Sequence, residues 1–251
     1  MATTLLRAIA TTDYRAMPTE TSPEHERQQG GFGASTRRFR MSDRNNADDG
    51  TEAGREAGGE RNAGRARNDD GDPLAWETLD STVAYTCPGF DVRHETVRLP
   101  DDTETDFDYL AEPPAVVVLP FTSEGRVVLI EEWRQAVGRV NRGLPAGTVE
   151  SEDADLEAAA RRELREETGY EGERMESLLT VEPINGVADS VHHYFLAEEC
   201  EPTGSQDLDV DESIRTVTKS YETFREAVRA GEMRDGRAVL ALACYELAGG
   251  R

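Results

Sequence analysis

Three glutamates stand within five positions of the segment RRELREETGY, residues 161–170. At about 100° per residue, a helix through this segment places Glu163, Glu166 and Glu167 on one face. Leu164 lies beside them, so the face borders a hydrophobic core and not only solvent. Clustered carboxylates in such surroundings repel one another, and a divalent cation removes that cost. Because hard oxygen ligands suit Mg²⁺ or Mn²⁺, the segment predicts a metal site.

The same glutamates have a simpler interpretation as a solvated helix face. Charged residues make up 31% of the chain, and runs of charge usually lie on the surface. The neighbouring residues favour the metal site instead. Leu-Pro-Ala-Gly at 144–147 precedes the predicted helix (about 155–168), and Gly169 follows it where a glycine commonly ends a helix.

The stretch LPAGTVESEDADLEAAARRELREETGY, residues 144–170, resembles the Nudix box, written G-x5-E-x7-R-E-U-x-E-E-x-G-U with U aliphatic. Gly147 matches its first glycine. The second half matches without a gap at Arg162, Glu163, Leu164, Glu166, Glu167 and Gly169. Two positions depart from the pattern. Eight residues, not seven, separate the acidic Asp153 from Arg162, and Tyr170 stands where an aliphatic residue is usual.

The resemblance implies a fold and a set of roles. It implies an α+β chain in which a Nudix α/β/α sandwich with a mixed sheet follows a small antiparallel β module. The metal ligands would be Glu163, Glu166, Glu167 and the backbone carbonyl of Ala146. Arg162 would hold a glutamate in position by a charge-assisted contact. Metal bound there would neutralise a diphosphate, polarise its phosphorus and acidify a water.

The resemblance covers about residues 76–248 and is greatest to the ADP-ribose pyrophosphatase branch. That branch hydrolyses nucleoside diphosphate sugars to a nucleoside monophosphate and a sugar phosphate. Arg134, in EEWRQAVG, matches a branch arginine near the substrate phosphates, with an ordinary surface arginine as the alternative. The branch usually has Glu directly before Leu-Pro-Ala-Gly, whereas this chain has Gly143.

The catalytic base is expected on a loop that follows the sheet. The loop at 201–212 is acidic, and we choose Glu212 because Asp-Glu before a strand resembles the branch pattern. A solvated acidic loop is the alternative. The predicted catalytic set is therefore Glu166, Glu167, Arg162 and Glu212.

Other residues have weaker claims on the site. The loop at 182–190 is expected to line the substrate pocket. His192 and His193 alternate along a predicted strand, so at most one of them faces the site. Trp76 and Trp133 are candidates for stacking on a base, with core or interface packing as the alternative.

Two other functions are compatible with the residues. One is a nucleotide-sugar sensor without hydrolysis, which an intact set of three metal-binding glutamates disfavours. The other is a house-cleaning hydrolase of nucleoside triphosphates, which the preceding β module disfavours. Turnover with magnesium over a panel of nucleotides separates all three.

The composition limits the partners. The formal net charge is −23, which repels nucleic acid and anionic membranes, so neither is expected as a partner. Lys219 is the chain's one lysine among 28 basic residues, a usage that suggests a halophile and a protein more stable at molar salt. Cys87, Cys200 and Cys244 form no zinc or disulfide pattern, which favours the cytoplasm.

The sequence divides into three parts. Residues 1–73 are polar and rich in glycine, and are expected to form a disordered tail. Residues 74–112 contain alternating runs separated by turn signals and predict the β module. Residues 113–251 form the predicted Nudix domain. Since the resembling branch exchanges the module between subunits, a homodimer is expected.

Overall fold

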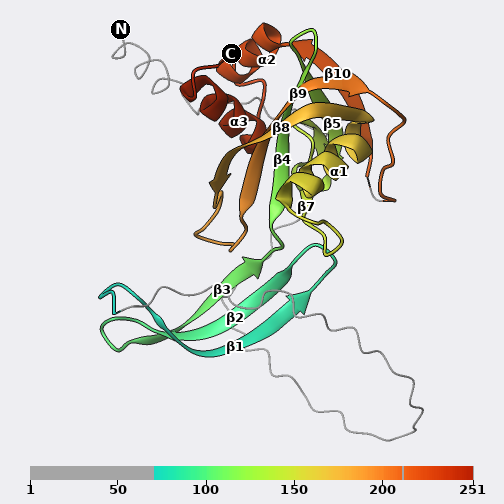
Figure 1. Cartoon of the computed structure of the whole chain (residues 1–251). Coiled ribbons are helices and arrows are strands. Elements are labelled where there is room, and N and C mark those ends of the chain that lie inside the picture. Colours follow the sequence, from blue (N-terminus) through green and yellow to red (C-terminus); the bar gives the residue numbers. More distant parts are fainter. Residues whose placement is uncertain (1–70, 211, 251) are drawn as a thin grey trace, which may run out of the picture. The chain divides into compact units, whose positions relative to one another are not determined.

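The computed structural model describes residues 71–250 except Asp211 (Figure 1). The predicted tail therefore lies almost wholly outside the described residues. In chain order the elements are β1 (Glu77–Thr86), β2 (Asp91–Arg98), β3 (Glu104–Ala111), β4 (Ala115–Thr122), β5 (Arg126–Arg134), η1 (Gln135–Val137), β6 (Arg139–Gly143), β7 (Ala146–Thr148), α1 (Leu156–Thr168), β8 (Tyr170–Val181), β9 (His192–Pro202), β10 (Ile214–Ser220), α2 (Tyr221–Arg229) and α3 (Gly236–Leu247).

Strands β1, β2 and β3 form an antiparallel sheet of their own, in that order. Glu95 of β2 is buried there and accepts hydrogen bonds from the hydroxyls of Ser81 and Tyr109, at 3.1 and 3.3 Å. A buried carboxylate needs such partners because burial without them is costly. β3 also exchanges backbone hydrogen bonds with the loop before β9, from Leu110 N to Val187 O and from Asp189 N to Leu110 O.

The other strands form a mixed sheet in the order β10-β5-β4-β9-β8, to which β6 adds beside β5 and β7 beside β4. The pair β4–β9 is parallel, and the remaining pairs are antiparallel. The apolar runs 116–119 and 127–130 are buried in β4 and β5, as continuous apolar strands covered on both faces should be.

Helices cover both faces of the mixed sheet (Figure 1). On one face α1 packs Ala159, Ala160 and Leu164 against β4 and β9. On the other face α2 and α3 pack around Phe224 and Leu242. The structure is thus an α+β sandwich with a mixed sheet, preceded by a separate three-stranded antiparallel sheet, as the sequence predicted.

Two short strands do not stand out in the sequence. β6 and β7 have five and three residues, and their polar and glycine-containing sequences carry no apolar alternation. They form because β4 and β5 pair with each other only at Phe121 and Val127, which leaves other residues of both strands for β7 and β6 to pair with. Both strands lead directly to the predicted metal-binding segment.

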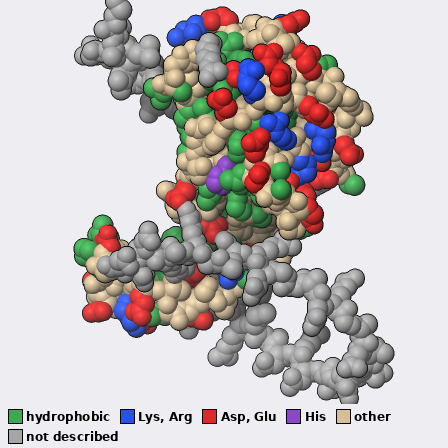
Figure 2. All heavy atoms as spheres, viewed as in Figure 1, with side chains coloured by type: hydrophobic (Ala, Val, Ile, Leu, Met, Phe, Trp, Pro, Cys, Tyr) green, Lys and Arg blue, Asp and Glu red, His purple; other side chains and the backbone are tan. Residues whose placement is uncertain are grey.

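The surface carries both acidic and basic side chains. Figure 2 shows acidic and basic side chains interspersed over the face of the domain drawn there. No helix among the described residues is long and apolar enough to cross a membrane.

Candidate functional site

Helix α1 carries the predicted metal-binding glutamates, and local signals fix both of its ends. Asp155 is the N-cap, and its side chain accepts a hydrogen bond from Ala158 N at 2.8 Å. At the other end Gly169 adopts φ 74°, the left-handed conformation that glycine tolerates best. A Cβ at Gly169 would lie 2.6 Å from the carbonyl oxygen of Gly204, so this position excludes any side chain.

Two of the three glutamates are buried. Glu163 is 8% exposed and Glu167 is 2% exposed, while Glu166 is less deeply placed. Glu167 Oε2 accepts a hydrogen bond from Ala146 N at 2.8 Å, which fastens the helix to the first residue of β7. A Cβ at Gly147 would overlap the carboxylate of Glu163. The first glycine of the box is therefore required as the space into which Glu163 fits.

Burial changes the acidity of these carboxylates. It raises the pKa of Glu163 to about 7 and the pKa of Glu167 to about 8, because the ionised form loses hydration. Arg162 opposes the rise in the pKa of Glu163, and the hydrogen bond from Ala146 opposes the rise in the pKa of Glu167. The negative charge of Glu212 adds to both pKa values, so Glu212 lies close enough to interact with both groups.

Arg162 connects the helix to the preceding loop. It pairs with Asp153 through two parallel contacts, Nε to Oδ1 and Nη2 to Oδ2, both at 3.0 Å. Nη2 also donates to the carbonyl of Thr148 at 2.9 Å. Nη1 lies 2.8 Å from Glu163 Oε1 and 3.2 Å from Glu166 Oε2.

The extra residue in the box does not prevent Asp153 from pairing with Arg162. Asp153 still reaches Arg162, and the guanidinium lowers the pKa of the Asp153 carboxyl. Arg162 in turn has its own pKa raised by Asp153 first and then by the nearby glutamates. The arginine therefore stays charged between two groups of carboxylates.

The loop before β10 is attached to the end of α1. Thr203 N donates to Gly169 O, and Asp207 N donates to Glu166 O, both at 2.9 Å. These bonds satisfy carbonyls that the end of a helix leaves without partners. Farther along the loop, Glu212 Oε2 accepts a hydrogen bond from Asp209 N at 3.0 Å. The structure thus brings the candidate base to the same end of the sheet as the glutamates.

The residues fit a divalent cation by their chemistry. Two buried carboxylates with raised pKa values beside a third carboxylate form a set of oxygen donors whose mutual repulsion a cation would relieve. Within residues 71–250, Asp211 aside, no three acidic, histidine or cysteine side chains are already arranged to hold a metal. Instead Arg162 Nη1 lies between Glu163 and Glu166.

Arg134 lies at the end of β5, with Nη2 2.7 Å from Glu132 Oε2. Burial raises the pKa of Glu132, which Arg134 and Arg237 oppose. Sequence reasoning did not identify Glu132 or Arg237. The one signal in the sequence for this neighbourhood was Gly143. A Cβ at Gly143 would lie in a tight contact, 3.3 Å from the carboxylate of Asp235, which also accepts a hydrogen bond from Arg237.

The loop 182–190 and the two tryptophans were weaker candidates for the substrate pocket. The loop 182–190 contributes to a cavity of about 1180 Å³ that Glu150 and Glu152 of the box loop also line. Trp76, on the same cavity, and Trp133 are 47% and 48% exposed, so neither is a core residue.

The two histidines lie in different surroundings. His193 Nδ1 is 3.0 Å from Thr180 Oγ1, whereas His192 lies within electrostatic range of Arg237 and Asp235.

A mixed sheet between helices, with an arginine and three glutamates on one helix beside a glycine-containing segment, defines a class of hydrolases that act on diphosphates. The comparison with known families agrees. Residues 111–242 match the model of the NUDIX domain, and the chain belongs to the Nudix hydrolase family.

Relatives and solved structures are consistent with this assignment. An ADP-ribose pyrophosphatase of Bacillus subtilis is 30% identical over 175 residues, covering 69% of this chain and 94% of that protein. A GDP-mannose pyrophosphatase of Klebsiella pneumoniae is 30% identical over 142 residues, covering 54% of this chain and 71% of that protein. The crystal structure of an ADP compounds hydrolase shares the fold, with a TM-score of 0.61 at 17% identity over 70% of this chain and 97% of that one.

Proposed function

We propose that this protein catalyses Mg²⁺-dependent hydrolysis of ADP-ribose or a related nucleoside diphosphate sugar, giving a nucleoside monophosphate and a sugar phosphate. The observation that carries the proposal is the burial of Glu163 and Glu167 against Ala146 and Gly147. Buried carboxylates with raised pKa values are costly for a purely structural helix, and they favour a bound cation. The named activity of the Bacillus subtilis relative supports the substrate class.

Each residue has a role in this proposal. Glu163, Glu166, Glu167 and the carbonyl of Ala146 would hold Mg²⁺ or Mn²⁺. The cation, when bound, supplies charge neutralisation at the diphosphate and lowers the pKa of water. Arg162 keeps the glutamates in position through its contacts with Glu163 and Glu166.

Two residues would act on the reactants. Glu212 would take the proton from the attacking water as general base. Arg134 would bind the diphosphate, for which its guanidinium geometry is suited.

Domain boundaries and assembly belong to the same proposal. We divide the chain into a tail at 1–73, a β module at 74–112 and the catalytic domain at 113–251. The protein would act as a homodimer in the cytoplasm, with a nucleotide sugar as its substrate. Exposed apolar side chains of the module, Val83 and Tyr85 on β1 among them, support an interface there.

The test is turnover with and without Mg²⁺ over ADP-ribose, GDP-mannose and 8-oxo-dGTP. We expect ADP-ribose or GDP-mannose to be hydrolysed and Glu166→Gln or Glu167→Gln to lower kcat by at least about 100-fold. Glu157→Gln is the matched control, because Glu157 lies on the exposed part of α1 and pairs with Arg161. Full turnover in both site variants would reject the assignment.

GDP-mannose is the second candidate substrate. GDP-mannose pyrophosphatases are among the relatives, at 30% identity over 135 to 142 residues. The ratio of kcat/KM for ADP-ribose and GDP-mannose decides between the two.

A further inference from the structure

A row of polar side chains crosses β5 and β6 on the face that carries Arg134. In the antiparallel register Arg139 stands opposite Arg134, and Asn141 stands opposite Glu132. Residues directly opposite in such a pair project to the same side of the sheet, so these side chains form one surface. Arg139 Nη2 donates to Asn141 Oδ1 at 3.2 Å, which confirms that the row is continuous.

The start of α3 completes this surface. Asp235, 8% exposed, caps the helix by accepting from Ala238 N at 3.0 Å. Its other carboxylate oxygen accepts from Asn141 Nδ2 and from Arg237 Nη2, each at 3.3 Å. Gly143 favours this approach, because a Cβ there would lie in a tight contact, 3.3 Å from the Asp235 carboxylate. The carboxylate thus holds Arg237 at the edge of the β6 surface.

The surface is rich in arginine in a strongly acidic chain. Three arginines (Arg134, Arg139 and Arg237) lie on it with two carboxylates (Glu132 and Asp235), and Glu212 is close enough to Glu132 to raise the pKa of that group, so the surface is about neutral where the whole chain is −23. Among the described residues no carboxylate lies within ion-pair distance of Arg139, although like charges directly opposite in a sheet are destabilising. A bound anion would relieve that repulsion.

The arginine surface lies near the glutamates of α1. Gly143 is three residues before Ala146, so their Cα atoms are at most about 11 Å apart. Ala146 is the residue whose N–H contacts Glu167. Glu132, which pairs with Arg134, is also close enough to Glu167 to act on it electrostatically, so the arginine surface adjoins the glutamates.

We propose that Arg139 and Arg237 join Arg134 in a three-arginine site that binds the diphosphate of the sugar nucleotide, a refinement that rests on the proposed function. Arg139 and Arg237 are binding residues and do not take part in proton transfer. Asp235 is a positioning residue that orients Arg237 and lies beside Gly143.

The experiment measures anion binding independently of turnover. Metal-free protein is titrated with inorganic pyrophosphate in a calorimeter at fixed ionic strength, as wild type and as Arg139→Gln and Arg237→Gln. We expect each substitution to weaken binding about tenfold or more, since each removes charge-assisted hydrogen bonds. In the turnover assay KM should rise by a similar factor while kcat changes little.

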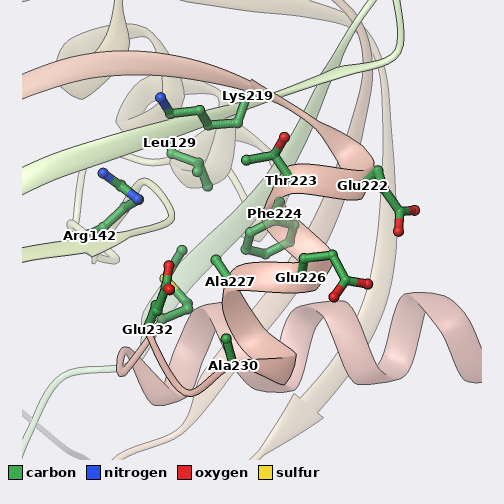
Figure 3. Close-up of a pocket in the computed structure, with 11 residues that line it drawn as sticks. Leu129, Arg142, Lys219, Glu222, Thr223, Phe224, Glu226, Ala227, Ala230 and Glu232 are labelled. Atoms are coloured by element: carbon green, nitrogen blue, oxygen red, sulfur yellow. The ribbon is translucent and has the colours of Figure 1, made fainter.

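Arg142→Gln is the matched control. Arg142 lies on β6 between Asn141 and Gly143, but its side chain pairs with Glu131 at 3.0 Å on the opposite face. Figure 3 shows it there beside a cavity of about 440 Å³ with Leu129 and Lys219. This variant removes the same charge from the same strand and should leave pyrophosphate binding unchanged.

The outcomes are distinguishable. The inference is overturned if wild type does not bind pyrophosphate, if both arginine variants bind it as tightly as wild type, or if Arg142→Gln weakens binding equally. If binding is lost only in Arg139→Gln and Arg237→Gln while no sugar nucleotide is hydrolysed, the anion site stands and the proposed function fails. Should Arg237→Gln unfold because Asp235 loses its partner, Arg139→Gln decides, since Arg139 has no carboxylate partner among the described residues.

Discussion

Glu163 and Glu167 place carboxylates in a protein interior that disfavours their charge. Burial raises the pKa of both groups, and the compensating contacts are few: Arg162 for Glu163 and the N–H of Ala146 for Glu167. Removing either contact would leave a buried charge without a partner, which is costly. The two glutamates therefore reduce the stability of the metal-free protein, a cost that the proposed cation would relieve.

The raised pKa values predict how the stability of the metal-free protein depends on pH. The Glu167 carboxyl releases its proton near its ordinary pKa of 4.5 when unfolded, but near about 8 when folded. Between these values the folded state binds more protons, so the free energy of unfolding falls as pH rises from 4.5 to about 8. Urea denaturation in the presence of a chelator measures this fall. It should be smaller in Glu167→Gln and unchanged in Glu157→Gln, and an equal slope in all three would contradict the prediction.

The contact between Gly147 and Glu163 predicts a sharp effect of one methyl group. In Gly147→Ala the added Cβ overlaps the Glu163 carboxylate and must displace it. We expect weaker Mg²⁺ binding. The Mg²⁺ concentration for half-maximal turnover should rise about tenfold or more, and turnover at a fixed, limiting Mg²⁺ concentration should fall accordingly. Gly89→Ala serves as the control, because a Cβ at Gly89 meets nothing within 4 Å. An unchanged Mg²⁺ requirement in Gly147→Ala would show that Glu163 is not a ligand.

At the scale of elements, the junction between α1 and the loop before β10 connects the proposed metal-binding helix to the loop that carries the candidate base. The helix ends at Gly169, and the backbone there accepts hydrogen bonds from Thr203 and Gly204. The same loop carries Glu212, the candidate base. The position of the base therefore depends on how the helix ends.

Gly169→Ala tests this dependence against a matched variant. Gly169 and Gly231 both have positive φ, at 74° and 71°, so alanine at either costs about 1–2 kcal/mol in backbone strain. Only at Gly169 would the methyl group also collide with the carbonyl of Gly204. We expect Gly169→Ala to lose more free energy of unfolding than Gly231→Ala and to lower kcat as well. Equal losses, with unchanged kcat, would show that the loop is not positioned by this contact.

At the scale of the whole molecule, the charge of −23 and the separate β sheet set the expected behaviour in solution. Mutual repulsion of like charges opposes compaction at low ionic strength. The proposal of a high-salt cytoplasm would be contradicted by equal stability and activity at low and molar salt. The β module has a buried glutamate at its centre and exposed apolar side chains on its surface.

The homodimer is the prediction at this scale. Sedimentation equilibrium of the full chain should give about twice the subunit mass of 27.7 kDa. Tyr85→Ser in β1, where Tyr85 is 58% exposed, should weaken the dimer at least about tenfold if the module forms the interface. Leu247→Ser at the end of α3 removes a comparably exposed apolar side chain and should have no effect. A single mass of 27.7 kDa at every concentration would exclude the dimer.

Local signals in the sequence were sufficient for the helix and for its chemical character. A glycine at 169 that ends the helix and three glutamates on one face depend only on residues within the helix or next to it, and the sequence shows both directly. The strands of the β module were predictable for the same reason, because their alternating runs and turn signals are local features of the sequence.

The polar surface of β5, β6 and α3 depended on tertiary structure. Asn141 and Asp235 meet across 94 residues of chain, and no local pattern encodes such a meeting. The acidity of Glu163 and Glu167 was also decided by tertiary burial, since the same residues on an exposed helix would titrate normally. The sequence determined which side chains could bind a cation and a diphosphate. Folding decided their desolvation and their neighbours, because both arise from contacts between distant segments.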